Sequence, residues 1–246
     1  STTGQPQGND RVWYFAVNLM SLDNISIENL VIVNPPAYHI RLSNVGSVTV
    51  SGCVLHGEGA NSDGLHCDGP SNDIAISNCN FATGDDSIAL NCPEGYSGDI
   101  SRVTVTGCTF NSISLMRLYT ASASGQFSID SVTVSNCSGT FQGGAFLVGF
   151  VVTGKAAAIA SLSVSDCTLT APLVFGVAEH FGTIQAKNVT FFPTPFDWRS
   201  QPNRAGAFLR PPPWPNGLND WIGTSVILEN CRIVRRESTD VAAVIF

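Results

Sequence analysis

A six-residue phrase recurs along the chain and constrains its fold more than any other feature. It reads aliphatic residue, any residue, aliphatic residue, polar residue, then Gly, Asn or Asp, then Cys. The copies are Val48–Cys53, Ile74–Cys79, Val103–Cys108, Val132–Cys137, Leu162–Cys167 and Val226–Cys231, with Ile25–Leu30 as a seventh that ends in Leu. From Leu30 to Cys167 the steps are 23, 26, 29, 29 and 30 residues. A period of about 20–30 residues indicates a stack of similar structural units.

The alternation inside each copy indicates a β-strand whose aliphatic side chains share one face. Helical periodicity, which ankyrin and tetratricopeptide arrays need, is not visible, and the leucine signature of leucine-rich repeats is missing. The phrase therefore predicts an all-β fold, a single-stranded right-handed parallel β-helix of about seven to nine coils. The stretch Ala186–Phe191 is a candidate for one further coil.

The last two positions of the phrase predict a corner and an internal column. Gly, Asn and Asp tolerate left-handed backbone better than other residues, so the chain is expected to turn at the fifth position on every coil. The Cys that follows then points inward, and six cysteines at one coil position would stack. Small buried hydrophobic side chains are the favoured interpretation of this column. A linear column does not offer the tetrahedral arrangement of zinc, whereas disulfides between neighbouring coils remain open.

Composition and charge exclude two classes of partner. Only 13% of the residues are charged, the net charge is -7, and no basic patch is present, so nucleic acid is not expected as a partner. No apolar run reaches about 18 residues, so no membrane span is expected. The start Ser1–Gly4 resembles a processed end, so the missing signal peptide says little about the compartment of the protein. We expect a secreted or extracellular protein, or one on a virion surface if it derives from a phage.

The chain is expected to form one β-helix domain over residues 1–246. A Pro- and Trp-rich segment over residues 193–219 interrupts the repeat after its regular part. A segment of this length without repeat pattern is usually a functional loop, a cap or a subunit contact. We favour a loop or cap over the end of the solenoid.

The inward hydrophobic residues of the second strand in each coil set a register that stacks residues distant in sequence. They align as Ile40 and Leu42, Leu65 and Cys67, Ile88 and Leu90, Met116 and Leu118, and Phe146 and Val148. The outward residues then form three columns: Tyr38, Asp63, Asp86 and Ser114; Arg41, His66, Ala89 and Arg117; Ser43, Asp68, Asn91 and Tyr119. Asp85 immediately precedes Asp86, so acids, a histidine, two arginines and tyrosines share one patch.

Three carboxylates in this patch indicate chemistry. Taken singly, each has a structural interpretation, because aspartate before a strand is often a turn residue. Taken together, Asp63, Asp85 and Asp86 would repel one another at about 5 Å, which a fold rarely keeps without a metal or a reaction to serve. Carboxylate pairs at such separations perform glycoside hydrolysis, and we expect Asp63 and Asp86 to lie about 4–7 Å apart on the solvent face.

Two motifs around these aspartates resemble those of the polygalacturonase family of glycoside hydrolases, family 28. Asn61–His66 resembles its Asn-Thr-Asp-Gly-hydrophobic-Asp motif, and Gly84–Ala89 resembles its Gly-Asp-Asp-Cys-hydrophobic-Ala motif. The resemblance covers roughly Arg11 to Ala121. It implies an inverting hydrolase without metal or other cofactor, in which Asp86 is the general acid and Asp63 and Asp85 position and activate water. Since that family usually carries further coils before Arg11, the chain is expected to be a fragment lacking N-terminal coils.

Departures from the family pattern bear on the substrate. His66 replaces the second acid of the first motif, Ser114–Arg117 replaces Gly-His-Gly, and Ala145–Val148 replaces the Arg-Ile-Lys that binds the uronate carboxylate. Losing that cation argues against galacturonate at the central subsite, and Arg117 is a candidate for binding another acidic sugar. The candidate substrate-binding residues are His39, Arg41, His66, Asp68, Arg117 and Tyr119, with a polysaccharide or oligosaccharide as the partner.

Two other functions remain open. The pattern also resembles bacteriophage tailspikes, trimeric β-helices that cut or bind bacterial surface polysaccharide, so the chain is expected to be a monomer, or a trimer if it is tailspike-like. A purely carbohydrate-binding, adhesin-type β-helix would fit the loss of the family's histidine and lysine. A polysaccharide lyase or epimerase of this architecture would use calcium and an arginine base, for which Arg117 and the acids are candidates.

Overall fold

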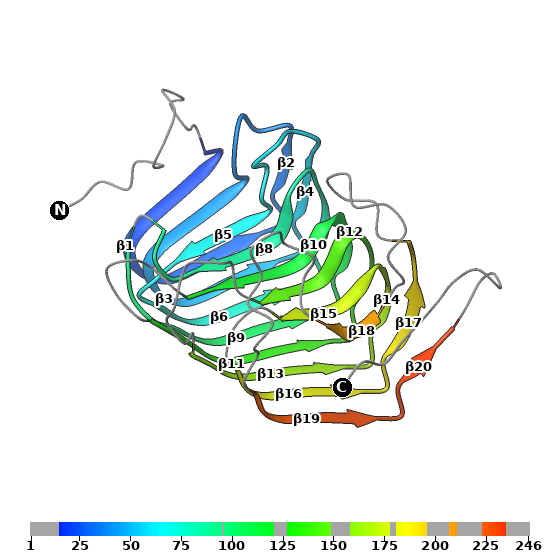
Figure 1. Ribbon diagram of the computed structural model, residues 1–246. Coiled ribbons are helices and arrows are strands. Elements are labelled where there is room, and N and C mark those ends of the chain that lie inside the picture. Colours follow the sequence, from blue (N-terminus) through cyan, green and yellow to red (C-terminus); the bar gives the residue numbers. More distant parts are fainter. Residues whose placement is uncertain are drawn as a thin grey trace.

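The computed structural model describes residues 15–94, 96–120, 127–148, 158–177, 181–195, 207–210 and 223–234. Twenty strands in these ranges join into one network of parallel pairings, and they wind around a common axis (Figure 1). The predicted all-β, right-handed parallel β-helix is therefore confirmed. None of the described residues belongs to a helix long and apolar enough to cross a membrane.

Each coil contributes a strand segment to each of three faces. The first face holds the second halves of β1 (Val17–Glu28) and β3 (Ile40–Ser51), with β6 (Ser71–Ser77), β9 (Ile100–Thr106), β11 (Ser128–Ser135), β13 (Ala158–Ser165), β16 (Phe181–Lys187) and β19 (Gly223–Glu229). The second face holds β2 (Val31–Val33), β4 (Val54–Gly57), β7 (Asn80–Thr83), the first halves of β10 (Thr109–Tyr119) and β12 (Ser138–Val148), β14 (Thr168–Ala171), β17 (Thr190–Pro193) and β20 (Arg232–Ile233). The third face holds the first halves of β1 and β3, the second halves of β10 and β12, and β5 (Leu65–Asp68), β8 (Asp86–Asn91), β15 (Leu173–Val177) and β18 (Ala207–Arg210). The described strands thus make eight coils, within the expected seven to nine.

The copies of the phrase stack in register on the first face. Val48 pairs with Ile74, Ile74 with Val103, Val103 with Val132, and Val132 with Leu162. All five side chains are at most 1% exposed, as expected for the inward positions of a strand covered by the coil interior.

The further coil expected near Ala186–Phe191 is confirmed. It begins earlier than the sequence indicated, because β16 starts at Phe181 and pairs with β13 below and β19 above. Val189 stands where the neighbouring copies carry Cys. The Pro- and Trp-rich segment that follows includes β18, which pairs with β15 and continues the third face. Residues 196–206 and 211–219 lie outside the described residues, so a cap stays a prediction.

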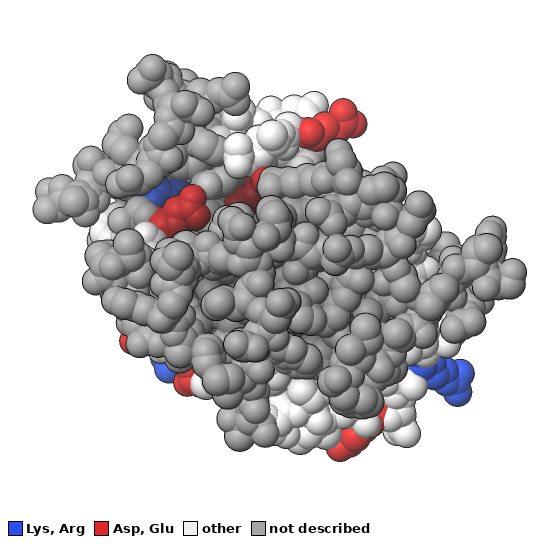
Figure 2. Space-filling view, viewed as in Figure 1, with Lys and Arg blue, Asp and Glu red and all other residues white. Residues whose placement is uncertain are grey.

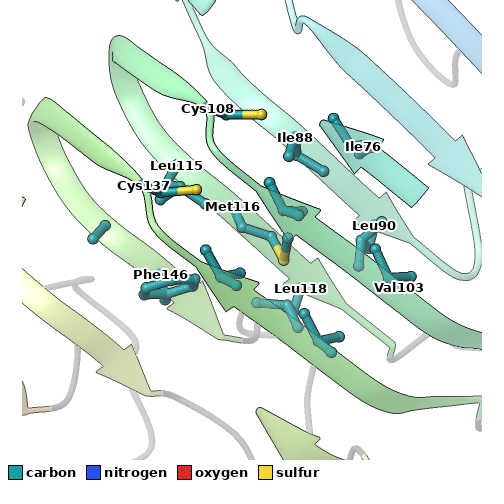
Figure 3. Packing of buried hydrophobic residues seen from close by; sticks show 14 of the residues in the cluster. Ile76, Ile88, Leu90, Val103, Cys108, Leu115, Met116, Leu118, Cys137 and Phe146 are labelled. Carbon is teal, nitrogen blue, oxygen red and sulfur yellow. The ribbon is translucent and has the colours of Figure 1, made fainter. Parts of the chain in front are cut away.

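The predicted corner and the cysteine column are both present. The fifth position of each copy has left-handed φ angles of 51–66°, at Asn29, Gly52, Asn78, Gly107, Asn136, Asp166, Asn188 and Asn230. Figure 3 shows Cys108 and Cys137 pointing into the interior beside Met116 and Phe146. All eight cysteines are free, and five of the six in the column are at most 3% exposed, namely Cys53, Cys79, Cys108, Cys137 and Cys167. The column therefore consists of small buried side chains, and no disulfide links the coils.

A second left-handed corner separates the third face from the first. It lies one residue before the first five copies along the chain, at Asn24, Ser47, Asp73, Arg102 and Ser131, with φ angles of 54–59°. Ser and Arg have no particular preference for this conformation, so residue type gave no signal for it. On these five coils the corner marks where the first-face copy of the phrase begins.

Candidate active site

The third face has the register that the sequence predicted. Ile40 pairs with Leu65, Leu65 with Ile88, and Ile88 with Met116. The outward columns follow from these pairs, and they contain Arg41, His66, Ala89 and Arg117 in one row and Ser43, Asp68, Asn91 and Tyr119 in the next. Residues from four consecutive coils therefore meet on one surface.

Asp63, Asp85 and Asp86 form the cluster that the stacking predicted. One carboxylate oxygen from each lies within 4.8 Å of the others. Among the described residues they are also the group that could hold a metal ion. Asp63 and Asp86 are 5% and 4% exposed and Asp85 is half-buried, so the cluster is more enclosed than an open solvent face.

Small residues of the two motifs bring the aspartate-bearing turns together. A Cβ on Gly84 would overlap the carbonyl oxygen of Gly59, and a Cβ on Gly64 would lie 2.6 Å from the carbonyl oxygen of Ser87. The hydroxyl of Ser62 accepts a hydrogen bond from the Gly84 amide at 2.9 Å and donates one to Gly59 at 2.6 Å. The two turns are thus tied directly to each other, which fixes the spacing of the carboxylates.

Asp86 begins β8 and is held between two side chains of β10. The Ser114 hydroxyl donates to its Oδ1, and Nη1 of Arg117 lies 3.9 Å from its Oδ2. Burial raises the pKa of Asp86 to about 7, against the lowering effect of Arg117 and with the help of Asp63 and Asp85. A carboxyl group that keeps its proton near neutral pH is suited to general acid catalysis.

Asp85 is the most accessible member of the cluster. The backbone N–H of Asn61 donates to its Oδ2 at 3.3 Å. Burial and the charge of Asp63 raise the pKa of Asp85 to about 6, although Arg117 opposes them. Asp85 and Asp86 interact strongly, so protons leave the pair in two shared steps.

His66 connects Asp63 to a second group of charges. Its Nδ1 lies 2.7 Å from Oδ2 of Asp63, and its Nε2 lies 3.2 Å from Oδ1 of Asp68 and 3.9 Å from Oε2 of Glu94. The ring stacks on Tyr38, with centroids 4.0 Å apart and planes 4° from parallel. Burial lowers the pKa of His66, but hydrogen bonding to Asp63 and Asp68 outweighs it and raises the pKa to about 10. His66 therefore lies between two carboxylates that favour its protonated form.

Asp68 is anchored from the other side by Arg41 and Ser43. Nε and Nη2 of Arg41 donate to Oδ2 of Asp68 at 3.0 and 2.6 Å, and the Ser43 hydroxyl donates to the same oxygen at 2.6 Å. Arg41 also lies over the ring of Phe15, 5.2 Å from its centroid. Asp68 is fully buried and Arg41 is 5% exposed, so this ion pair is almost inaccessible to solvent.

The candidate substrate-binding residues fall into two groups. Arg117 and Tyr119 are half-buried and reach the surface, with the Arg117 guanidinium 5.9 Å from the Tyr119 ring centroid. The others, His39, Arg41, His66 and Asp68, are at most 5% exposed. His39 is fully buried, and its Nδ1 donates a hydrogen bond to the backbone carbonyl oxygen of Asp63 at 2.9 Å. These four side chains are thus almost inaccessible in this structure, and their part in substrate binding stays a prediction.

Sequence reasoning missed one charged residue near the site. Glu94 lies in the loop after β8, and its carboxylate accepts a hydrogen bond from Nδ2 of Asn91 at 2.6 Å and one from the Tyr38 hydroxyl at 3.5 Å. Strand register predicts the neighbours of strand residues only, so it could not predict where the loop residue Glu94 lies. The closest residue that the register did place is Asn91, in the third outward column. In Figure 2, blue and red side chains lie side by side toward the N-terminal coils.

The column that contains Arg117 is uncharged over the next two coils and then reaches Arg210, which pairs with Gly176. On the next coils Arg117 is followed by Leu147 and then Gly176. Leu147 is 5% exposed and takes the outward position where the resembling family carries a cation. The third face is therefore polar over β3, β5, β8 and β10 and apolar over β12 and β15.

Comparisons with known proteins point to a family of glycoside hydrolases. The family model described as "Glycosyl hydrolases family 28" matches residues 11–138. A probable polygalacturonase of Arabidopsis thaliana is 33% identical over 78 residues, which cover 31% of this chain and 17% of the plant protein.

Solved structures share the same architecture. The endo-xylogalacturonan hydrolase of Aspergillus tubingensis superimposes with a TM-score of 0.68 at 14% identity, covering 93% of this chain and 63% of that one. Endopolygalacturonase I of Stereum purpureum gives a TM-score of 0.54 at 13% identity, covering 89% and 70%. At such identities the likeness shows the fold. The chain spans less than two thirds of the plant and Aspergillus proteins.

Proposed function

Because the chain belongs to the glycosyl hydrolases of family 28, whose model matches more than half of its residues, we propose that it hydrolyses a polysaccharide with Asp63, Asp85 and Asp86. The observation that carries the proposal is the convergence of the three carboxylates within 4.8 Å in a largely enclosed position. Such a cluster is unfavourable for folding, and glycoside hydrolysis is the chemistry that uses it.

The three carboxyl groups lie in different environments, which suit them to different catalytic roles. Asp86, whose pKa is raised to about 7 chiefly by burial, protonates the oxygen of the leaving sugar. Asp63, whose Oδ2 lies 2.7 Å from Nδ1 of His66, orients the attacking water together with the half-buried Asp85. As the glycosidic bond breaks, water supplies the hydroxyl of the new reducing end and its proton passes to the carboxylates.

Two considerations about stereochemistry point in different directions. Oxygens of the three carboxylates lie within 4.8 Å of one another, which is closer than the roughly 6.5–9.5 Å between the carboxyl groups of most inverting enzymes and nearer the roughly 5–5.5 Å of retaining ones. Against this, the imidazolium bonded to Asp63 stabilises its charge and makes it a weaker nucleophile toward carbon. We propose inversion through water, on that ground and on the family resemblance.

Arg117 suggests the class of sugar. Its side chain is 22% exposed and lies 3.9 Å from Asp86, whereas Arg41 is buried against Asp68. The relatives named above are described as acting on galacturonans, but this chain has Ala145–Val148 in place of the family's uronate-binding motif. We propose an extracellular polymer that contains an acidic sugar, whose carboxylate contacts Arg117 one coil nearer to the acids.

The test is a screen for release of reducing ends from pectic, other plant and bacterial polysaccharides, with and without chelator. The proposal predicts release that chelator does not change and that Asp86→Asn abolishes. Products that absorb as unsaturated sugars, or release that needs calcium, would favour a lyase instead. Binding to a polymer without any release would favour a carbohydrate-binding β-helix.

A further inference from the structure

His66 links the catalytic aspartates to a row of buried charges beneath the third face. The row runs from Asp63 through His66 and Asp68 to Arg41, with successive contacts of 2.7, 3.2 and 2.6 Å. All four side chains are at most 8% exposed. None of these contacts is needed to close a coil, because backbone pairing between β3, β5 and β8 already does so.

The acidic groups around the ring favour its doubly protonated form, although Nε2 and Oδ1 of Asp68 are not aligned for a hydrogen bond. A neutral imidazole carries one N–H, so one of the two carboxylates would face a nitrogen lone pair at 3.2 Å or less. The groups that face the ring from neighbouring elements are Asp63, Asp68 and Glu94, all acidic, with Tyr38 stacked on its plane. The stacking and the fork of Arg41 on Asp68 also prevent the ring from turning away.

We propose that His66 is a positioning residue that decides which of the three clustered aspartates acts as the base. It holds Oδ2 of Asp63 as a hydrogen-bonded anion, so that the shared proton resides on Asp85 or Asp86 and Oδ1 of Asp63 is left to orient water. Asp68 and Arg41 act through His66 by fixing the far edge of its ring. The inference rests on the proposed function for its consequence in catalysis, but its protonation pattern can be measured without any substrate.

The first test is therefore nitrogen NMR of the histidine rings in the ligand-free chain, with His66 assigned through its contact with Tyr38. At pH 8 both ring nitrogens of His66 should carry protons, whereas an ordinary histidine with a pKa near 6.5 is neutral there. Asp68→Asn should bring the midpoint of this titration down toward the ordinary value, and Asp130→Asn, an exposed aspartate of β11, should not move it. A His66 that is neutral with one tautomer in the wild-type chain at pH 8 overturns the proposal.

The second test compares two neutral replacements of His66. His66→Asn places an amide N–H near the position of Nδ1 and keeps the bond to Asp63, while His66→Gln reaches toward Asp68 instead. On the polysaccharide that gives reducing ends in the screen, kcat should fall by about 10²-fold in His66→Gln and less in His66→Asn, with KM little changed. Equal losses that follow the drop in melting temperature would overturn the positioning role. If the wild-type chain cleaves none of the polymers, the proposed function fails while the NMR result still decides this inference.

Discussion

The first and third faces are built by the same coils, yet their outward residues differ in kind. On the first face the central outward column is short and mostly hydroxylated, as Thr49, Ala75, Thr104 and Thr133. On the third face the corresponding coils present Arg41, His66, Ala89 and Arg117. The inward residues of both faces are hydrophobic, because each is covered by the coil interior.

This difference indicates which positions of a solenoid can carry functional side chains. Stacking restricts inward positions to side chains that fill the same space on every coil, whereas outward positions are free to vary. The outward column of the first face is exposed and uncharged, so it costs little free energy of folding. The third face departs from that pattern over four coils and buries charges that pair with one another, and such departures mark the candidate site.

The largest contrast between the faces should appear in catalysis. Asp86→Asn removes the general acid, and we expect the rate of reducing-end release to fall by about 10²–10⁴-fold. Asp130→Asn makes the same change of charge at an exposed position and should leave the rate unchanged. A rate that Asp130→Asn lowers as much as Asp86→Asn would remove the distinction between the two surfaces.

The second contrast concerns ion pairs. Arg41→Met leaves Asp68 buried without its fork of donors, and we expect the free energy of unfolding in urea to fall by about 3–5 kcal/mol. Arg102→Met breaks a pair with Asp73 whose side chains are both about half exposed, and it should change stability little because water screens that pair. Equal effects of the two substitutions would show that burial on the third face does not matter.

A third, smaller effect links the site to pH. Burial raises the pKa of Asp86 to about 7, above the roughly 3.9 of an unfolded aspartate, so the folded chain binds this proton more tightly. Stability should therefore fall as pH rises from about 4 to 7 and stay reduced above that. Asp86→Asn should raise the melting temperature by about 4 °C or more at pH 8 and much less at pH 4.5. A gain that is the same at both pH values would contradict this linkage.

The smallest effect is expected at a corner of the first face. Asn136 has a φ of 54°, so Asn136→Ala should cost about 1 kcal/mol in the free energy of unfolding and Asn136→Gly should cost little. Neither should change the rate of cleavage. A loss of rate in Asn136→Ala would mean that the two faces are coupled more tightly than their separation by strands suggests.

Much of this molecule was predictable because stacking converts a sequence period into spatial neighbours. The phrase located the corner at Asn78 and Gly107 and the buried Cys column, and the inward aliphatic residues brought Asp63 beside Asp86. The positions of residues at the second corner and in loops could not be predicted from the period. The second corner includes Ser47 and Arg102, whose types do not favour a left-handed backbone.

Burial at the site was the other property that sequence could not supply. Alternation predicts that Arg41 and Asp68 point outward, but it does not say that their mutual pairing and the stacked Tyr38–His66 rings leave them almost inaccessible. Glu94 comes from a loop, and His39 bonds to the backbone of Asp63 next to a turn, where strand alternation no longer holds. Each miss concerns a position at which side-chain pairing, rather than the period, determines the outcome.

The most direct test of the account is the anomeric configuration of the first product. The wild-type chain and the polysaccharide it cleaves are followed by proton NMR from the first minutes, before mutarotation equalises the two forms. The account predicts reducing ends in the configuration opposite to that of the cleaved bond, formed by water held at Asp63 and Asp85. Reducing ends that keep the original configuration, or vinylic protons of an unsaturated sugar, would contradict it.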